Sequence, residues 1–207
     1  MDYMKDFYLK RAEENLPELL IEERAPVSVR KLTTGGSEGL RRRHDGVIIE
    51  EGEVAKGGAT PIGKSELCPD GSAVLDPGDV LVLDLGCHYV GRLSFRMWWV
   101  DEYIDAPVRL SVRFHEALSE LDDDYSSYNS WLCRSWLQDE VINIDFPGIY
   151  SMPRRYAARY VRLECLCSPK KIRLSDFVFR AESSADMSAL APCGACDEEL
   201  LAIDRVA

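Results

Sequence analysis

Residues 91–100 read Gly91-Arg92-Leu93-Ser94-Phe95-Arg96-Met97-Trp98-Trp99-Val100, and large apolar side chains alternate with other side chains along most of this stretch. A period of two places successive side chains on opposite faces of a β-strand. The apolar face holds Leu93, Phe95, Met97 and Trp99, and the opposite face holds Arg92, Ser94, Arg96 and Trp98. This pattern is typical of an antiparallel strand with one face in the core.

Other segments indicate further strands. Residues 80–85 are nearly all apolar, as in a strand covered on both faces, and residues 107–116 alternate again. Shorter strand patterns lie at 27–32, 47–49, 141–146, 159–167 and 172–180, whereas 51–78 and the acidic stretch 118–130 are expected to be loops. Because no long central helix is present, we predict an all-β fold, a jelly-roll-like antiparallel β-sandwich.

The two ends of the chain have a different character. Residues 1–20 have a loose helical stripe that ends near Pro17, and residues 197–206 have a second stripe with acidic residues in its first turn. We therefore predict an N-terminal helical extension over 1–24 and a β-sandwich domain over 25–185. Residues 186–207 would then form a linker and a C-terminal helix stub, the start of a helical domain.

The composition excludes several functional classes. The chain has 207 residues, with 25 basic and 36 acidic side chains, so its net charge is −11 at pH 7. An acidic chain is unsuited to general nucleic-acid binding or to anionic membrane surfaces. No apolar run approaches the roughly 20 residues that span a bilayer, and no secretory signal is visible. The seven cysteines, an odd number, indicate reduced thiols and a cytoplasmic protein.

Four segments, in this order, resemble motifs of bacterial α-L-rhamnosidase-type glycoside hydrolases. They are Val82-Leu83-Asp84-Leu85-Gly86 with the following Val90-Gly91-Arg92-Leu93, then Val112 to Leu118, then Arg159-Tyr160-Val161-Arg162-Leu163-Glu164, and finally Cys196 to Leu201. A further match is the strand start Asp139-Glu140-Val141, and the resemblance covers residues 78–207. His115 and Gly194 depart from the family's pattern, which has Gly and Phe there.

The resemblance implies an accessory β-sandwich rather than the catalytic part of such an enzyme. In that family the catalytic acid and base lie in an (α/α)₆ barrel, which would begin where this sequence ends. We therefore expect no catalytic residue in this chain, which would be a fragment or the product of a shortened gene. Its expected partner is the barrel of the parent chain, on which it packs or whose cleft it shapes. The alternative is a stand-alone carbohydrate-binding module; no set of residues supports an independent small enzyme.

Carbohydrate binding is one interpretation of the aromatic residues of this chain. The candidate residues are Trp98, Arg96, Trp131 and Trp136. Tryptophan offers a large apolar face on which a pyranose ring can stack, and arginine donates hydrogen bonds to hydroxyl groups. The structural alternative is that Trp98 packs against the N-terminal helix or against the barrel.

Two motifs invite a metal or redox interpretation. Asp122, Asp123 and Asp124 are weak calcium candidates, because hard cations take several carboxylate oxygens, but a solvated acidic loop explains them equally. Cys193 and Cys196 form a C-x-x-C motif before the last helix. Too little chain follows for a thioredoxin fold, and no second Cys/His pair has zinc spacing. We interpret the motif as an exposed junction and expect no other cofactor.

Overall fold

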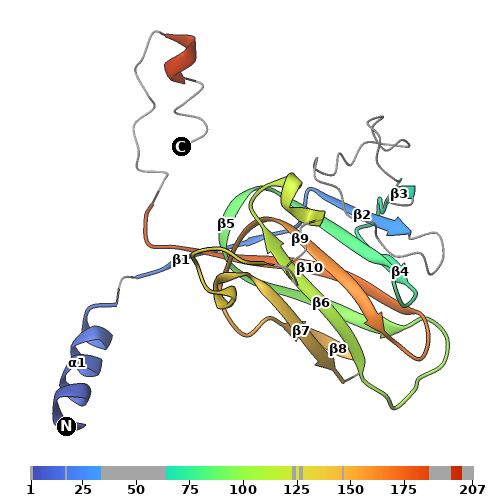
Figure 1. Ribbon diagram of the computed structural model, residues 1–207, viewed down its shortest axis with the longest axis horizontal. Helices are drawn as coiled ribbons and strands as arrows, with labels where there is room; N and C mark the ends of the chain where they lie inside the picture. Colours follow the sequence, from blue (N-terminus) through green and yellow to red (C-terminus); the bar gives the residue numbers. More distant parts are fainter. Residues whose placement is uncertain are drawn as a thin grey trace. The chain divides into compact units, whose positions relative to one another are not determined.

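The computed structural model describes residues 2–16, 18–33, 64–122, 125, 128–145, 147–186 and 197–201 (Figure 1). The described elements are α1 (Asp2–Glu14), β1 (Leu20–Arg24), β2 (Ser28–Thr33), β3 (Lys64–Leu67), β4 (Ala73–Leu75), β5 (Val80–Trp99), β6 (Val108–His115), η1 (Leu118–Asp122), η3 (Arg134–Trp136), β7 (Asp139–Ile144), β8 (Gly148–Ser151), β9 (Tyr156–Cys167) and β10 (Ile172–Ser183). Residues 198–201 are helical.

The chain forms two compact units. Ile21–Glu182 make the β unit, while Met1–Leu20 and Ser183–Ala207 make the other, which contains α1 and the helical residues 198–201. The predicted all-β fold with a helix near each end is therefore confirmed. Among the described residues, no helix is long and apolar enough to cross a membrane.

Strand β5 belongs to both halves of the sheet, whose strand order is β1-β10-β5-β9-β6-β7. Its first half pairs with β2 and β9, and its second half pairs with β10 and β8, always antiparallel. The pairing register shifts between Asp84 and Tyr89, where Gly86 has a φ of 84°. Glycine enters this left-handed region without steric cost. The two strands predicted within 80–100 are thus one bent strand.

The two halves of the sheet share one core. Leu81 and Leu83 from the first half of β5 belong to the same buried cluster as Phe95 and Met97 from the second half. Burial of this apolar surface is the main stabilising term of the unit. The shared core is compatible with the predicted sandwich, and the jelly-roll order of strands stays a prediction.

A second, smaller cluster lies on the other face of the first half of β5. It contains Leu32, Val80, Val82 and Leu121. Leu121 belongs to η1, so the start of the stretch predicted as a loop over 118–130 is folded against the sheet. That expectation was wrong there because apolar residues spaced for a single 3₁₀ turn give little periodic signal. Residues 80–85 are covered on both faces, as predicted.

Four other strands were missed by the sequence patterns. β3 and β4 lie in the stretch predicted as loop, and they span only four and three residues. β1 lies in the predicted helical extension, and all five of its residues are exposed, so it lacks apolar alternation. β8 is likewise short and mostly exposed. The strand predicted at 47–49 lies outside the described residues.

Gly91 is expected to be indispensable for the pairing of β5 with β10. A Cβ atom at this position would lie 2.0 Å from the carbonyl oxygen of Arg180, a backbone atom that cannot yield without breaking the pairing. We predict that Gly91→Ala lowers the free energy of unfolding by about 3 kcal/mol or more, measured by urea denaturation. Gly148→Ala is the matched control, because a Cβ atom added there would meet no other atom within 4 Å. A change below about 1 kcal/mol is expected for it, and equal losses in both variants would contradict the prediction.

Candidate functional site

Arg96 and Trp98 lie together on the outer face of β5. The alternation predicted from the sequence is confirmed, because Leu93, Phe95 and Met97 are buried while Trp98 is 41% exposed. The guanidinium carbon of Arg96 lies 5.7 Å from the centroid of the Trp98 ring, within the range of a cation–π contact. Two of the predicted binding residues therefore form one local group.

A β-bulge in the neighbouring strand fixes the position of Arg96. The register of β10 against β5 shifts between Ser175 and Val178, and Asp176 has a φ of 50°. The bulge turns Phe177 into the core and places the Oδ2 atom of Asp176 2.8 Å from Nε of Arg96. Arg96 is thus held between a carboxylate and an indole ring.

Trp131 and Trp136 form a separate group on the segment before β7. They are 89% and 71% exposed, and η3, which ends at Trp136, contains no buried residue. β8 begins four residues after β7 ends, and its Gly148 is opposite Met97 of β5. Trp136 precedes the other end of β7, a strand of six residues or about 20 Å. Trp131 and Trp136 thus belong to a different segment from Trp98 and Arg96.

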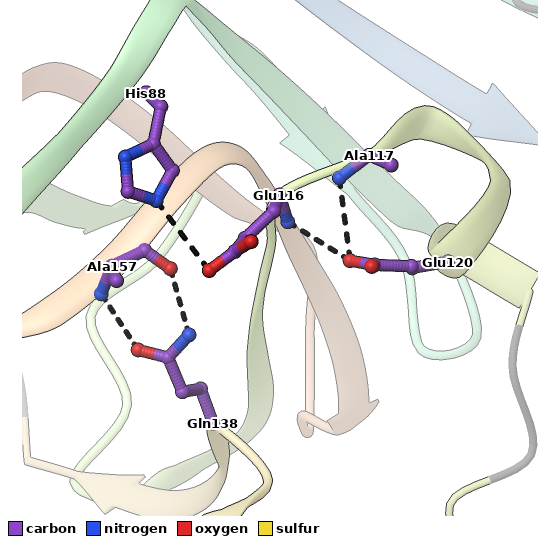
Figure 2. A network of polar contacts seen from close by, with 6 residues as sticks. All are labelled: His88, Glu116, Ala117, Glu120, Gln138 and Ala157. Atoms are coloured by element: carbon purple, nitrogen blue, oxygen red, sulfur yellow. Dashed lines mark hydrogen bonds and ion pairs between the residues drawn. The ribbon is translucent and has the colours of Figure 1, made fainter. Parts of the chain in front are cut away.

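Gln138 fixes the end of this tryptophan segment, residues 131–136, to the sheet (Figure 2). Its side-chain Nε2 donates to the carbonyl of Ala157 at 2.7 Å, and its Oε1 accepts from the Ala157 backbone N–H at 2.6 Å. The Gln138 carbonyl also accepts from the N–H of Phe114 at 3.0 Å. One residue therefore links the segment to both β9 and β6, and the two tryptophans are presented on a fixed base.

The neighbouring turn after β6 is held by Glu120 (Figure 2). Its Oε2 accepts from the backbone N–H groups of Glu116 and Ala117 at 2.9 and 3.3 Å. The Glu116 carboxylate reaches His88, with Oε1 3.5 Å from Nε2, and both of these side chains are exposed. Exposed pairs of this kind contribute little to stability, so the backbone bonds of Glu120 are the structural element here.

His115 is buried beneath the turn that follows β6. It is 1% exposed, and the Tyr125 hydroxyl lies 3.1 Å from its Nδ1 atom. Burial, together with the charges of Arg162 and Arg113, lowers the pKa of His115 to about 3. Sequence alternation placed His115 on the polar face of β6, but did not show that the following segment covers this position.

The metal and redox candidates lie almost entirely outside the described residues. This holds for Asp123, Asp124 and the Cys193/Cys196 pair, and Asp122 is described only as the last residue of η1. Within the described ranges, no group of three or more His, Cys, Asp or Glu residues is arranged to hold a metal ion. The calcium site stays a prediction.

The described surface thus carries two sets of exposed aromatic and arginine side chains. Trp98 and Arg96 lie on a sheet face, and Trp131 and Trp136 lie on a segment that also contains the exposed Arg134. Indole faces stack on flat rings, and guanidinium groups donate to hydroxyl or carboxylate oxygens. Both sets offer the chemistry of ligand or partner binding.

Comparison with known proteins gives matches to one family. Residues 59–181 match the family model described as the glycosyl hydrolase family 78 alpha-rhamnosidase N-terminal domain. Among solved structures, the rhamnosidase from Klebsiella oxytoca with rhamnose bound is 28% identical with a TM-score of 0.70. The match covers 96% of this chain and 36% of that chain.

A family 78 rhamnosidase of Bacillus sp. GL1 is also similar. It is 19% identical with a TM-score of 0.42, and the match covers 63% of this chain and 13% of that one. This chain therefore spans about a third or less of the length of either solved protein. No curated protein matches.

The contribution of Gln138 can be measured by truncation. Gln138→Ala removes both side-chain bonds to Ala157, leaving a part-buried backbone N–H and C=O without these partners. We predict a loss of about 1–3 kcal/mol in the free energy of unfolding, measured by urea denaturation. His88→Ala, which removes only the exposed pair with Glu116, should cost less than about 1 kcal/mol. A larger loss for His88→Ala than for Gln138→Ala would refute this assignment.

Burial of His115 predicts a pH dependence of stability. The unfolded chain protonates this group below its ordinary pKa of about 6.5, whereas the folded chain does so only near the lowered value of about 3. Stability from this group is complete above the unfolded pKa and is lost as pH falls toward 3. His115→Gln should therefore reduce the slope of unfolding free energy against pH, between pH 6 and 4, by up to about 1.4 kcal/mol per pH unit. Identical slopes for the two proteins would show that His115 protonates freely in the folded state.

Proposed function

This chain belongs to the family of glycosyl hydrolase family 78 alpha-rhamnosidase N-terminal domains, and we propose that it serves a catalytic (α/α)₆ barrel of the same parent protein. The accessory domain of a rhamnosidase-like protein, predicted from the sequence, is confirmed by the family match. The proposal adds its role: the domain packs on the barrel and shapes the cleft in which the barrel cleaves rhamnosides.

The observation that best supports this proposal is the alignment with the Klebsiella oxytoca rhamnosidase, which covers very different shares of the two chains. Nearly all of this chain aligns, but the aligned part is little more than a third of that chain. The remainder of such a protein is long enough for a further domain, since domains commonly have 50–200 residues. This supports the assignment of hydrolysis to a part of the parent that does not correspond to this chain.

The tryptophan segment is suited to contact a barrel. Trp131 and Trp136 are the two most exposed tryptophans of the described chain, and the bonds of Gln138 keep their base fixed. Aromatic side chains that are held in place form favourable centres of interfaces at low entropic cost. We assign this segment to the contact with the barrel or to the rim of its cleft.

We also infer a cytoplasmic location for the protein. Cys87, Cys133, Cys165 and Cys167 are free thiols in the described part of the chain. Free thiols in this number are usual where glutathione and thioredoxin keep cysteines reduced. Thiol titration of the purified protein should therefore find these cysteines reduced.

Carbohydrate binding by the domain itself is the second candidate function. The observation that favours it is the pairing of the exposed Trp98 with Arg96, which Asp176 holds in place. An indole beside an oriented guanidinium offers both a stacking face and hydrogen-bond donors for a sugar ring.

The accessory role predicts where hydrolytic activity resides. The 207-residue chain should release no phenol from aryl α-L-rhamnosides, whereas the protein encoded when the reading frame is followed past Ala207 should release it. Trp131→Ala and Trp136→Ala in that longer protein should raise KM or lower kcat at least threefold, while Gly148→Ala, which alters an exposed glycine of β8, should not.

Two results would contradict the proposal. One is turnover by the 207-residue chain, and the other is a stop codon directly after Ala207. Calorimetric titration of the chain with a set of neutral and acidic oligosaccharides tests the second candidate: at least one of them should release heat, and that heat should be lost in Trp98→Ala. If none of these oligosaccharides releases heat, the second candidate is wrong.

A further inference from the structure

The outer face formed by β5 and β10 collects arginines in an otherwise acidic chain. Across the two strands, Arg180 is directly opposite Arg92, and Arg173 is directly opposite Trp98. Arg96 lies between Arg92 and Trp98 on β5, and its side chain is on the same side of the sheet as Trp98. We call this set, Arg92, Arg96, Trp98, Arg173 and Arg180, the arginine face. The whole chain, by contrast, carries 36 acidic and 25 basic side chains.

Internal ion pairs compensate this positive charge only in part. Arg92 pairs with Glu182, whose other oxygen lies 3.9 Å from Nε of Arg155, and Arg96 pairs with Asp176. Two carboxylates therefore serve three arginines, and two more arginines extend from β10.

The positive charge of the two arginines of β10 is only partly neutralised by neighbouring carboxylates. Arg173 and Arg180 are both exposed. Hydrogen bonds from Ser72 lower the pKa of Asp70, and the charge of Arg173 adds a smaller effect, so Arg173 is near one carboxylate. Arg180 forms no ion pair with any residue in the described part of the chain. With Arg155, the face and its edge thus have five arginines and three nearby carboxylates.

The rest of the face carries hydroxyl groups and a few apolar side chains. Ser94 and Ser151 are directly opposite each other on β5 and β8, and Ser175 is opposite Arg96 on β10. Ile149 is the other large exposed apolar side chain beside Trp98. Trp98 and the nearby Ile149 and Val178 give this surface an apolar part, which guanidinium and hydroxyl groups surround. An aromatic face beside uncompensated guanidinium groups is complementary to a ligand that has both rings and anionic groups.

We propose that the arginine face binds a polysaccharide whose sugars carry carboxylates, that is, a uronate polymer. The proposal rests on carbohydrate binding as the second candidate function and names its ligand class. Trp98 stacks on a pyranose ring, and the guanidinium groups of Arg173 and Arg180 bind uronate carboxylates, for which their planar fork is suited. From Arg92 to Trp98 the strand rises about 20 Å, so the face matches several consecutive sugars.

The test is affinity electrophoresis or calorimetry of the full 207-residue chain with polygalacturonate. The wild-type chain should bind, and the double variant R173Q/R180Q should bind at least tenfold more weakly. Trp98→Ala should weaken binding at least fivefold. Arg109→Gln is the matched control, because it removes one exposed arginine of β6 that lies outside the face; its affinity should stay within twofold of wild type. Circular dichroism confirms that each variant is folded.

Two further polymers separate the ligand classes. Dextran presents neutral sugar rings and poly-L-glutamate presents carboxylates without rings, and neither should bind comparably to polygalacturonate. Equal binding of poly-L-glutamate would reduce the face to a general polyanion site and overturn the proposal. Dextran binding that R173Q/R180Q leaves unchanged would overturn the uronate assignment while leaving carbohydrate binding intact.

An absence of polygalacturonate binding would also overturn the inference. In that case, loss of rhamnoside hydrolysis by the longer protein carrying R173Q/R180Q would assign the face to the contact with the barrel. The accessory role would survive that result, because it is tested separately through the location of the hydrolytic activity.

Discussion

The structure depends on one bend in β5, where a single strand leaves one half of the sheet and enters the other. Gly86 adopts a φ of 84° there, and its N–H donates to the Asp84 carboxylate at 2.8 Å. The same carboxylate accepts from Nε of Arg159 at 3.2 Å, and the backbone carbonyl of Asp84 accepts from the N–H of Val27. Asp84 therefore ties β9 and the residue before β2 to β5 at the bend, and both halves of the sheet depend on this geometry.

Alternation along β5 and β6 was sufficient to predict which side chains form the core. It identified Phe95 and Phe114 as buried and Trp98 as exposed, because in a strand the period of two is a direct consequence of backbone geometry. In β10 the alternation changes phase between Leu174 and Phe177, which are both buried. The sequence therefore contained evidence of the bulge. Because the bulge places Asp176 beside Arg96, this contact too was indicated by the change of phase.

Other features depend on contacts that no local pattern encodes. His115 is buried because η1 and Tyr125 fold over β6, and Gln138 bonds to Ala157, which is 19 residues away. Such contacts require the strand register, which depends on the whole sheet. β1 had no alternation to reveal it, since all its residues are exposed and its pairing with β10 rests on backbone groups.

Net charge describes the whole chain and not its surfaces. The excess of acidic residues argues against binding to nucleic acids, because a broad basic surface would be needed to neutralise many phosphates. A small basic face does not need this overall positive charge. At physiological salt, acidic residues more than about 8–10 Å away have little effect on it, because their charge is screened. Asp176 and Glu182 of β10 pair with Arg96 and Arg92 of β5. These two carboxylates therefore do not neutralise Arg173 and Arg180, although both arginines lie on the same strand as Asp176. An acidic protein can therefore hold a locally basic surface, because strand pairing, and not composition, determines which charges are neighbours.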